Sequence, residues 1–174
     1  QLNSADRPTR LPIDRVFTIR GFGTVVTGTL SSGQISTGDS LELQPSALHA
    51  KVRGIETHGT ATTTAKRGQR VAINLKGVDI DEISRGDVLT HAGVLKPSRM
   101  LDIDLHLLPH APRAFEGHVK VLAHIGTAQV NGTVVLLDRD VLEPGETAMA
   151  QLRLDRWVVA LGGDRVVLRG FEML

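Results

Sequence analysis

Apolar and polar residues alternate along most of the chain, which is the pattern of β-strands that are buried on one face. The alternating segments are rich in valine, isoleucine, leucine and threonine, and glycines separate them. The pattern predicts strands over residues 13–20, 23–30, 40–44, 50–57, 70–76, 88–91, 99–107, 116–124, 127–137, 147–154, 157–161 and 165–171.

A glycine followed by an acidic residue recurs directly before a predicted strand. Glycine tolerates the positive φ of a tight turn, and the carboxylate that follows can accept hydrogen bonds from nearby backbone amides. Each pair is therefore predicted to begin a strand. The pairs are Gly38-Asp39, Gly86-Asp87, Gly145-Glu146 and Gly163-Asp164.

Residues 79–85, DIDEISR, depart from the strand pattern. Asp79 followed three residues later by Glu82 fits a capping box, and Arg85-Gly86 provides a stop signal. We expect one helical turn here.

Many short strands joined by glycine-rich turns are typical of barrels and sandwiches. Proline interrupts the strand pattern within residues 94–98, VLKPS, which indicates a domain boundary. The sequence predicts an all-β protein with two consecutive β-barrels of Greek-key type. The first covers residues 1–96 and the second residues 97–174.

The composition is that of a globular protein. Of the 174 residues 41% are hydrophobic and 22% charged, and no apolar run approaches the roughly 20 residues that span a bilayer. The chain has no cysteine, which excludes disulfides, thiolate metal sites and cysteine nucleophiles. The N-terminal residues lack the apolar core of a signal peptide. We expect a cytoplasmic location and no membrane partner.

The balance of charged residues favours local recognition of an anion. The net charge is only +1, but 15 of the 20 basic residues are arginines, which suit planar, bidentate contacts to anions. With four phenylalanines and one tryptophan, the chain has few side chains on which bases could stack.

No motif for catalysis or metal binding is present. The chain lacks G-x-x-x-x-G-K-[ST], so it is not expected to hydrolyse nucleotides by itself. No Gly-x-Ser-x-Gly elbow places a serine nucleophile. His106 and His110 could form one edge of a metal site on a helix, but they lie at a strand that leads into a proline turn. Packed or surface histidines are favoured, so no metal and no catalytic residue are expected.

Three charged residues stand at the edges of apolar strands. Asp14 and Arg15 open the first strand, and Arg70 opens VAINL after the basic run KRGQR, residues 66–70. Adjacent residues of a regular strand point to opposite faces, so Asp14 and Arg15 share one site only where the strand is irregular. The alternative is that Asp14 caps a turn and Arg15 pairs at the surface. Arg70 requires either an acceptor or a bound anion.

The order of these motifs resembles a known family. PIDRVFTIRGFGTVVTGTLSSGQISTGDSLEL and RGQRVAINLKGVDIDEISRGDVL resemble the opening and the end of the second domain of elongation-factor-Tu-type translation GTPases. HIGTAQVNGTVVLLD and PGETAMAQLRLDRWVVALGGDRVVLRG resemble the third domain of the selenocysteine-specific branch. The resemblance covers residues 8–171. It implies a middle piece without a cofactor of its own, between a GTPase domain that binds GTP and magnesium and winged-helix repeats that bind messenger RNA.

The resemblance implies that the first barrel holds the aminoacylated 3′ end of selenocysteinyl-tRNA for delivery to the ribosome. Asp14, Arg15 and Arg70 match the aminoacyl pocket. Elongation factor Tu has acids at the first two positions and asparagine at the third. The change to arginine at Arg15 and Arg70 is the pattern of the selenocysteine branch.

The same resemblance implies a site for the terminal adenosine of the tRNA. Glu56 matches the acid that contacts this nucleotide. Val25, Thr27 and Leu30 match the hairpin wall around it, whereas Asn74 replaces a leucine of elongation factor Tu. In the second barrel, Arg99, Arg113 and Arg139 are candidates for phosphates of the acceptor–T arm, with scattered solubilising arginines as the alternative.

Chemistry agrees with an arginine pocket, because a selenol is more acidic than a thiol and selenocysteine is an anion near neutral pH. Arginine stays protonated and offers several donors in a fixed fork. Three alternatives remain. The barrels could belong to a general elongation factor, to the GTPase subunit of an ATP sulfurylase, or to a module that only docks a partner.

Overall fold

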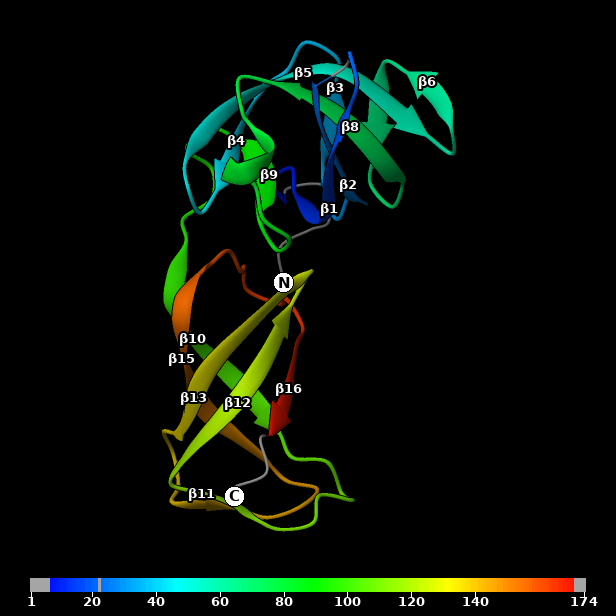
Figure 1. Ribbon diagram of the computed structural model, residues 1–174. Helices are drawn as coiled ribbons and strands as arrows, with labels where there is room; N and C mark the ends of the chain where they lie inside the picture. The colour runs from blue at the N-terminus through cyan, green and yellow to red at the C-terminus, as the bar shows by residue number, and fades with distance from the viewer. Residues whose placement is uncertain (1–6, 22, 171–174) are drawn as a thin grey trace.

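A computed structural model describes residues 7–21 and 23–170 of the chain. It consists of β-strands and one short 3-10 helix, η1 (Ile80–Glu82), in two β-structures that lie one above the other (Figure 1). This confirms the predicted all-β class. The described residues contain no helix that is long and apolar enough to cross a membrane.

The first β-structure is a closed barrel. Its sheet has the order β4-β9-β1-β2-β8-β5-β6, and a further pairing of β4 with β5 closes the ring, while β3 and β7 form a separate ribbon. The strands are β1 (Leu11–Ile19), β2 (Gly23–Thr29), β3 (Gln34–Ser36), β4 (Ser40–Gln44), β5 (Leu48–Thr57), β6 (Thr60–Thr62), β7 (Thr64–Lys66), β8 (Arg70–Lys76) and β9 (Val88–His91).

The interior of this barrel is filled by alternate residues of its strands. On β8, Val71, Ile73 and Leu75 are buried in the core, so Arg70 and the other intervening residues face outward. Apolar side chains from every strand of the ring join this core. Burial of these residues fixes which face of each strand remains available to a ligand.

The second β-structure is an open half-barrel. Its sheet has the order β10-β15-β13-β12-β16, with β11 and β14 as a separate pair. Its core includes the buried residues Val121, Ala123, Val134 and Leu152. The strands are β10 (Ser98–His106), β11 (Phe115–Glu116), β12 (His118–Ile125), β13 (Ala128–Leu136), β14 (Val141–Leu142), β15 (Thr147–Val158) and β16 (Val166–Gly170).

The glycine-acid turns have the predicted structure in all four places. The glycines have φ between 83° and 99°. Each acid accepts a hydrogen bond from the backbone N–H three residues earlier. The donor–acceptor pairs are Ser36 to Asp39 (2.7 Å), Ser84 to Asp87 (2.7 Å), Glu143 to Glu146 (3.2 Å) and Leu161 to Asp164 (2.9 Å).

Some predicted elements differ from the observed ones. The separate strand predicted at 157–161 is wrong, because β15 continues to Val158. The short strands β3, β6, β7 and β14 were not expected, since two or three residues are too few to show an alternation. The helical turn at 79–85 is one 3-10 turn, in which the Asp79 amide donates to the Glu82 carboxylate at 2.8 Å.

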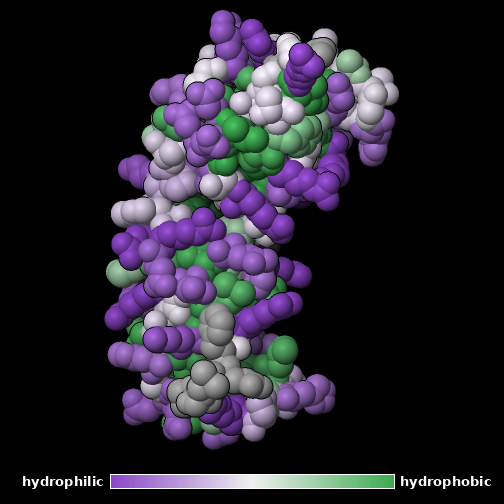
Figure 2. Space-filling view, viewed as in Figure 1, coloured by the Kyte–Doolittle hydropathy of each residue, from purple (hydrophilic) through white to green (hydrophobic). Residues whose placement is uncertain are grey.

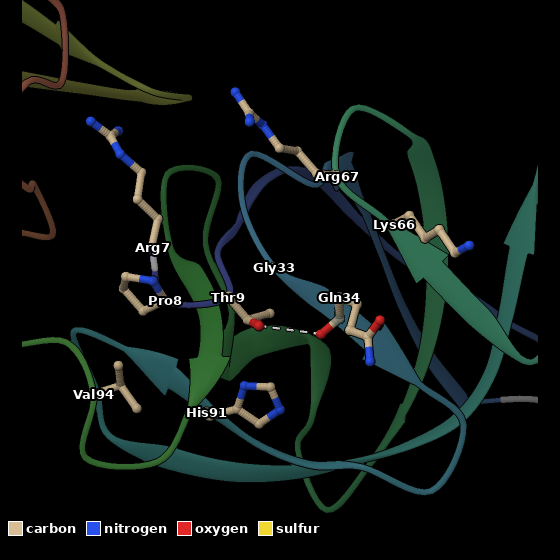
Figure 3. Close-up of a pocket in the computed structure, with 9 residues that line it drawn as sticks. All are labelled: Arg7, Pro8, Thr9, Gly33, Gln34, Lys66, Arg67, His91 and Val94. Carbon is tan, nitrogen blue, oxygen red and sulfur yellow. Dashed lines mark hydrogen bonds between the residues drawn. The ribbon is translucent and has the colours of Figure 1, made fainter. Parts of the chain in front are cut away.

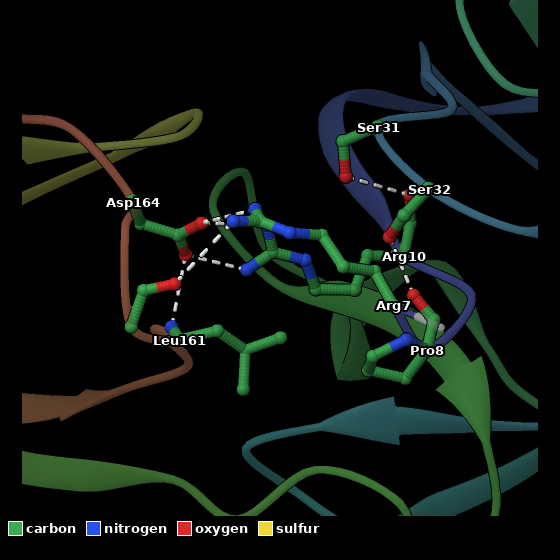
Figure 4. A network of polar contacts seen from close by, with 8 residues as sticks. Arg7, Pro8, Arg10, Ser31, Ser32, Leu161 and Asp164 are labelled. Carbon is green, nitrogen blue, oxygen red and sulfur yellow. Dashed lines mark hydrogen bonds and ion pairs between the residues drawn. The ribbon is translucent and has the colours of Figure 1, made fainter. Parts of the chain in front are cut away.

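Residues 92–97 connect the two sheets, and the boundary between 96 and 97 stays a prediction. An ion pair also links the two structures: Arg10 binds Asp164 with both terminal nitrogens, at 2.5 and 2.8 Å (Figure 4). The side chains of this pair are only 11% and 15% exposed. Such a bidentate contact fixes orientation as well as distance.

Apolar contacts and a close approach of two backbone segments also join the two β-structures. Val88 and Leu95 pack against Val159 across the junction. At Gly86, an added Cβ would lie 2.8 Å from Ala128 of the second sheet, so the two backbones approach too closely for a side chain. The two β-structures are therefore held against each other by charge and by apolar contact.

The pKa of Asp164 reflects this junction. Burial alone raises the pKa, but hydrogen bonds from Arg10 and from the Leu161 amide, with the charges of Arg10 and Arg7, outweigh it. The result is a pKa below the ordinary value of aspartate. The ionised form of Asp164 is thus favoured in the folded protein.

We predict that Asp164→Asn lowers the free energy of unfolding by about 3 kcal/mol at pH 7, because it leaves the Arg10 guanidinium buried without its anion. A lowered folded-state pKa stabilises the protein above the ordinary aspartate pKa, and this contribution is lost as the pH falls through the folded-state value. The difference between the variant and the parent should therefore shrink below about pH 4. Urea unfolding at several pH values measures it.

Asp138→Asn is the matched control, because Asp138 pairs with Arg139 in a more exposed ion pair at 3.4 Å. Exposed pairs contribute roughly 0–1 kcal/mol, so its effect should be small at every pH. Equal effects of the two substitutions would contradict the structural role of the junction pair.

Candidate aminoacyl site on the first barrel

A β-bulge interrupts the pairing of β1 with β2. Ile13 pairs with Gly28 and Arg15 pairs with Thr27, so Asp14 is the extra residue between them. Bulges of this kind bend a strand and re-aim side chains. Gly28 suits this place, because a Cβ there would lie 2.2 Å from the carbonyl oxygen of Pro12.

The bulge shifts the alternation of β1 by one residue. Leu11 and Ile13 are buried in the barrel core, and the next side chain that packs against this core is Val16. Asp14 and Arg15 lie between these core residues, and neither enters the interior. The irregular strand entry that a shared site requires is therefore present.

Asp14 is bound by side chains from two other strands. Its carboxylate accepts a hydrogen bond from the Thr27 hydroxyl at 2.7 Å. Arg70 donates to the same carboxylate from both terminal nitrogens, at 2.5 and 3.2 Å. The contact spans β1, β2 and β8, which are neighbours in the sheet. The structure thus brings Asp14 and Arg70 together.

Arg15 is adjacent to this pair and is exposed. It lies directly opposite Thr27, the residue that donates to Asp14. It makes no ion pair or hydrogen bond with any other residue that the structure describes. One carboxylate and two guanidinium groups leave a net charge of +1 at this site. The group can therefore neutralise one further anion.

The pKa of Asp14 is set by opposing effects. Burial raises the pKa. The hydrogen bonds from Arg70 and Thr27 and the charges of Arg70 and Arg15 outweigh this effect, so the pKa of Asp14 lies below the ordinary value of aspartate. The same contact raises the pKa of Arg70. Both partners therefore stay charged through the physiological range.

Glu56 lies on the same outer face as Arg15. Arg15 pairs with Thr27, Thr27 with Ala72, and Ala72 with Glu56, so these residues form one row across β1, β2, β8 and β5. Residues directly opposite in antiparallel strands point to the same face. The row spans three strand spacings, or about 14 Å.

Val25 and Leu30 occupy different environments. Val25 is two residues from Thr27 on β2, and so it belongs to the outer face although it is only 4% exposed. Leu30 is fully buried in the barrel core. The structure therefore groups Val25 and Thr27 with the charged site and does not group Leu30 with them.

Arg53 belongs to a second bulge, which was not predicted from the sequence. On β5, the pairing with β8 shifts between Val52 and Gly54, and Arg53 is the exposed extra residue. The core residues Val52 and Ile55 are three apart instead of two. That spacing is the signal in the sequence that could have revealed the bulge.

The other candidates do not form a second site. The His106 ring nitrogen lies 3.3 Å from the Thr147 hydroxyl, and the described part of the chain holds no cluster of three metal-ligating side chains. Arg139 pairs with Asp138 and Glu146, and Arg99 donates to a backbone carbonyl. Of the arginines considered for phosphates, these two are held by the protein itself.

Comparison with known proteins agrees with the two-part fold. Residues 23–90 match the family described as elongation factor Tu domain 2. Residues 102–172 match the β-barrel domain of selenocysteine-specific elongation factors. A solved bacterial selenocysteine-specific elongation factor, 24% identical, superposes on 97% of the chain with a TM-score of 0.78. That similarity concerns the fold.

Relatives with longer chains are similar over most of the sequence. A selenocysteine-specific elongation factor of Desulfomicrobium baculatum is 44% identical over 95% of the chain. The factor of the same name from Escherichia coli is 35% identical over 92%, and an elongation factor Tu of Streptomyces avermitilis is 34% identical over 87%. The chain spans 26%, 24% and 40% of these three proteins. The two family matches, these relatives and the fold together support the assignment of this chain to domains 2 and 3 of a selenocysteine-specific, elongation-factor-Tu-like factor.

Proposed function

We propose that these two domains bind and position the aminoacylated 3′ end of selenocysteinyl-tRNA, and that Asp14, Arg15 and Arg70 read the selenium atom. The observation that carries this proposal is the bidentate Asp14–Arg70 pair beside Arg15, which has no hydrogen-bond or ion-pair partner among the described residues. This arrangement presents fixed donors and a single uncompensated positive charge.

A selenolate suits this arrangement in charge and geometry. Arg70 uses two of its five N–H donors on Asp14, so others remain for a ligand. Arg15 is on β1, two strands or about 10 Å from β8, and its long side chain can approach from the opposite side. Asp14 acts as a positioning residue, because it holds one guanidinium in place before the ligand arrives.

Rejection of serine follows from the same geometry. A neutral hydroxyl does not compensate the net positive charge, and burying the guanidinium groups beneath the aminoacyl group leaves donors unpaired. Specificity thus arises from poor binding of the wrong ligand as well as from attraction to the right one.

We assign the terminal adenosine to the same outer face. Glu56 lies in the row that contains Arg15 and Thr27, and Val25 lies on the next row of that face. This places a hydrogen-bond acceptor for the nucleotide across the sheet from the amino-acid pocket. Leu30 supports this surface from the core.

The activity of the whole protein is part of the proposal. We infer a translation GTPase that works with the ribosome and messenger RNA, with GTP and magnesium bound outside this chain. The chain spans about a quarter of the length of its selenocysteine-specific relatives, so this inference about the whole protein rests on the names of those relatives. A filter-binding assay with aminoacyl-tRNA on the full-length protein tests it, and failure to bind any aminoacyl-tRNA would favour a sulfurylase-type role.

We predict that Arg15→Ala and Arg70→Ala in the full-length factor each weaken selenocysteinyl-tRNA binding far more than seryl-tRNA binding. Removal of a charge-assisted contact costs about 1.5–3 kcal/mol, which is roughly 10- to 150-fold in affinity. Arg20→Ala, an exposed arginine just beyond β1, is the matched control. Equal losses for both tRNAs would count against a selenium-reading pocket.

Asp14→Asn tests the positioning role. The variant removes the anchor of Arg70, so discrimination between selenocysteinyl-tRNA and seryl-tRNA should fall although the net positive charge increases. The stability of the protein should change by less than about 1 kcal/mol, because the Arg70 side chain is 53% exposed. Unchanged discrimination in the variant would show that charge alone is read.

The preference for selenocysteinyl-tRNA should depend on pH through the selenol. The lowered pKa of Asp14 keeps its carboxylate ionised as the pH falls, so the ligand protonates first. We expect the preference over seryl-tRNA to be full at neutral pH and to decline in acid, as the selenolate becomes neutral. A preference that stays constant down to about pH 4 would contradict recognition of an anion.

A further inference from the structure

Two exposed apolar side chains lie side by side on the outer face of the second sheet. Met149 on β15 is 53% exposed, and Leu137, directly after β13, is 51% exposed. The Leu137 N–H donates to the Met149 carbonyl oxygen at 2.9 Å, so the two residues are directly opposite each other. Val135 lies two residues before Leu137 and extends this apolar surface on the same face.

The core of the second domain does not use these side chains. On β15, Ala148 and Ala150 are buried in the core, so Met149 between them points outward. On β13, Val134 and Leu136 pack in the same core, so the residues that follow each of them face outward. Hydrophilic side chains cover most of the face of the molecule seen in Figure 2. A group of exposed apolar residues bordered by polar ones is typical of an interaction site.

Three carboxylates border this apolar surface. Asp104 of β10 is directly opposite Met149. Asp102 is two residues earlier on the same exposed face of β10. Asp138 follows Leu137, and its carboxylate accepts a hydrogen bond from the Met149 N–H at 3.3 Å. Together these residues form the acidic apolar patch, which consists of Asp102, Asp104, Val135, Leu137, Asp138 and Met149.

The negative charge of the acidic apolar patch is only partly compensated. Arg139 lies 3.4 Å from Asp138, but it also lies 3.4 Å from Glu146, so one guanidinium faces two carboxylates. Within residues 7–21 and 23–170, neither Asp102 nor Asp104 has a basic partner, and the hydrogen bond that Asp102 accepts at 3.3 Å comes from a neutral amide. Four carboxylates thus share one guanidinium, and the surface can accept further positive charge.

The sign of this charge selects the occupant. A surface with net negative charge repels RNA phosphates and acidic peptides. The hollow of the first domain in Figure 3 has the opposite character, because its lining includes Arg7, Lys66 and Arg67 and no acidic residue. A partner of the acidic apolar patch must therefore combine basic side chains with apolar ones.

We propose that the acidic apolar patch docks a basic protein segment whose apolar side chains cover Leu137 and Met149. Lysines or arginines of the segment pair with Asp102, Asp104 and Asp138 around that apolar centre. An apolar core within a charged rim is the common arrangement of protein interfaces. Charge complementarity guides the encounter, and burial of apolar surface contributes the affinity. This site is on the second domain and does not depend on the aminoacyl site of the first.

The test is NMR of the chain with ¹³C-labelled methionine methyl groups, because Met149 reports on the patch. Met100 is the internal reference: it is 57% exposed on β10, and it lies opposite Arg153, which repels a basic peptide. The probe is a synthetic peptide of alternating lysine and leucine. We expect it to shift the Met149 signal and not the Met100 signal, with an affinity that falls as the salt concentration rises.

Three other probes test the chemistry of the occupant. A peptide of alternating lysine and serine should bind at least about tenfold more weakly, because it has no apolar side chains to bury. A peptide of alternating glutamate and leucine and an oligouridylate should both leave the Met149 signal unchanged, because the patch repels negative charge.

Leu137→Ser should weaken binding of the lysine–leucine peptide roughly fivefold, because about half of a leucine side chain is no longer buried by the peptide. Asp104→Lys should weaken it by a similar factor, because it places a like charge beside Met149. Val167→Ser and Asp155→Lys are the matched controls and should retain the parent affinity. Val167 is 61% exposed on β16, and Asp155 is an exposed residue of β15 outside the patch.

Equal losses in the patch and control variants, an unchanged Met149 signal, or binding of oligouridylate at the patch would overturn the proposal. A Met149 shift that depends on protein concentration without any peptide would identify a second copy of the chain as the occupant instead. The same titration of the full-length factor is the last arm. A Met149 signal that no longer responds there would show that another domain already covers the patch, which rules out docking of a separate partner.

Discussion

The β-bulge at Asp14 is the constraint on which the outer face of the first barrel depends. The core requires Ile13 and Val16 on the inside, and one extra residue between them places both Asp14 and Arg15 outside. A regular strand would have directed one of these charges into the apolar interior. The bulge therefore keeps the apolar residues of β1 in the core and also places two adjacent charged residues on the outer face.

The Asp14–Arg70 contact then connects the bulge to the rest of the sheet. It crosses β2 to reach β8 and includes the Thr27 hydroxyl, so three strands hold one carboxylate. The contact leaves the site with a net positive charge while it orients one guanidinium. Because the contact is exposed, it contributes little to the stability of the fold.

A second carboxylate, that of Asp164, lies at the junction of the two domains and differs from Asp14 in its main effect. Asp164 is buried and receives Arg10 in a bidentate contact, so it contributes mainly to the fixed orientation of the two domains. The same carboxylate is shared with Arg7, whose Nη1 atom lies 3.7 Å from it.

Local sequence patterns predict the all-β class, most of the longer strands and the glycine-acid turns, because alternation and turn chemistry act between residues close in the chain. Asp39, Asp87, Glu146 and Asp164 each bind an amide three residues away. The sequence also shows Asp14, Arg15 and Arg70 as charged residues at the edges of apolar strands.

Which of these side chains meet depends on how the strands pair in the folded protein. A bulge is a change of register between paired strands, so the positions of Asp14 and Arg53 depend on the partner strand as much as on their own sequence. Leu30 and Thr27 are neighbours in one predicted wall, yet one is in the core and the other is on the surface. The continuation of β15 and the Arg10–Asp164 pair likewise arise from contacts between residues distant in the chain, which no local pattern contains.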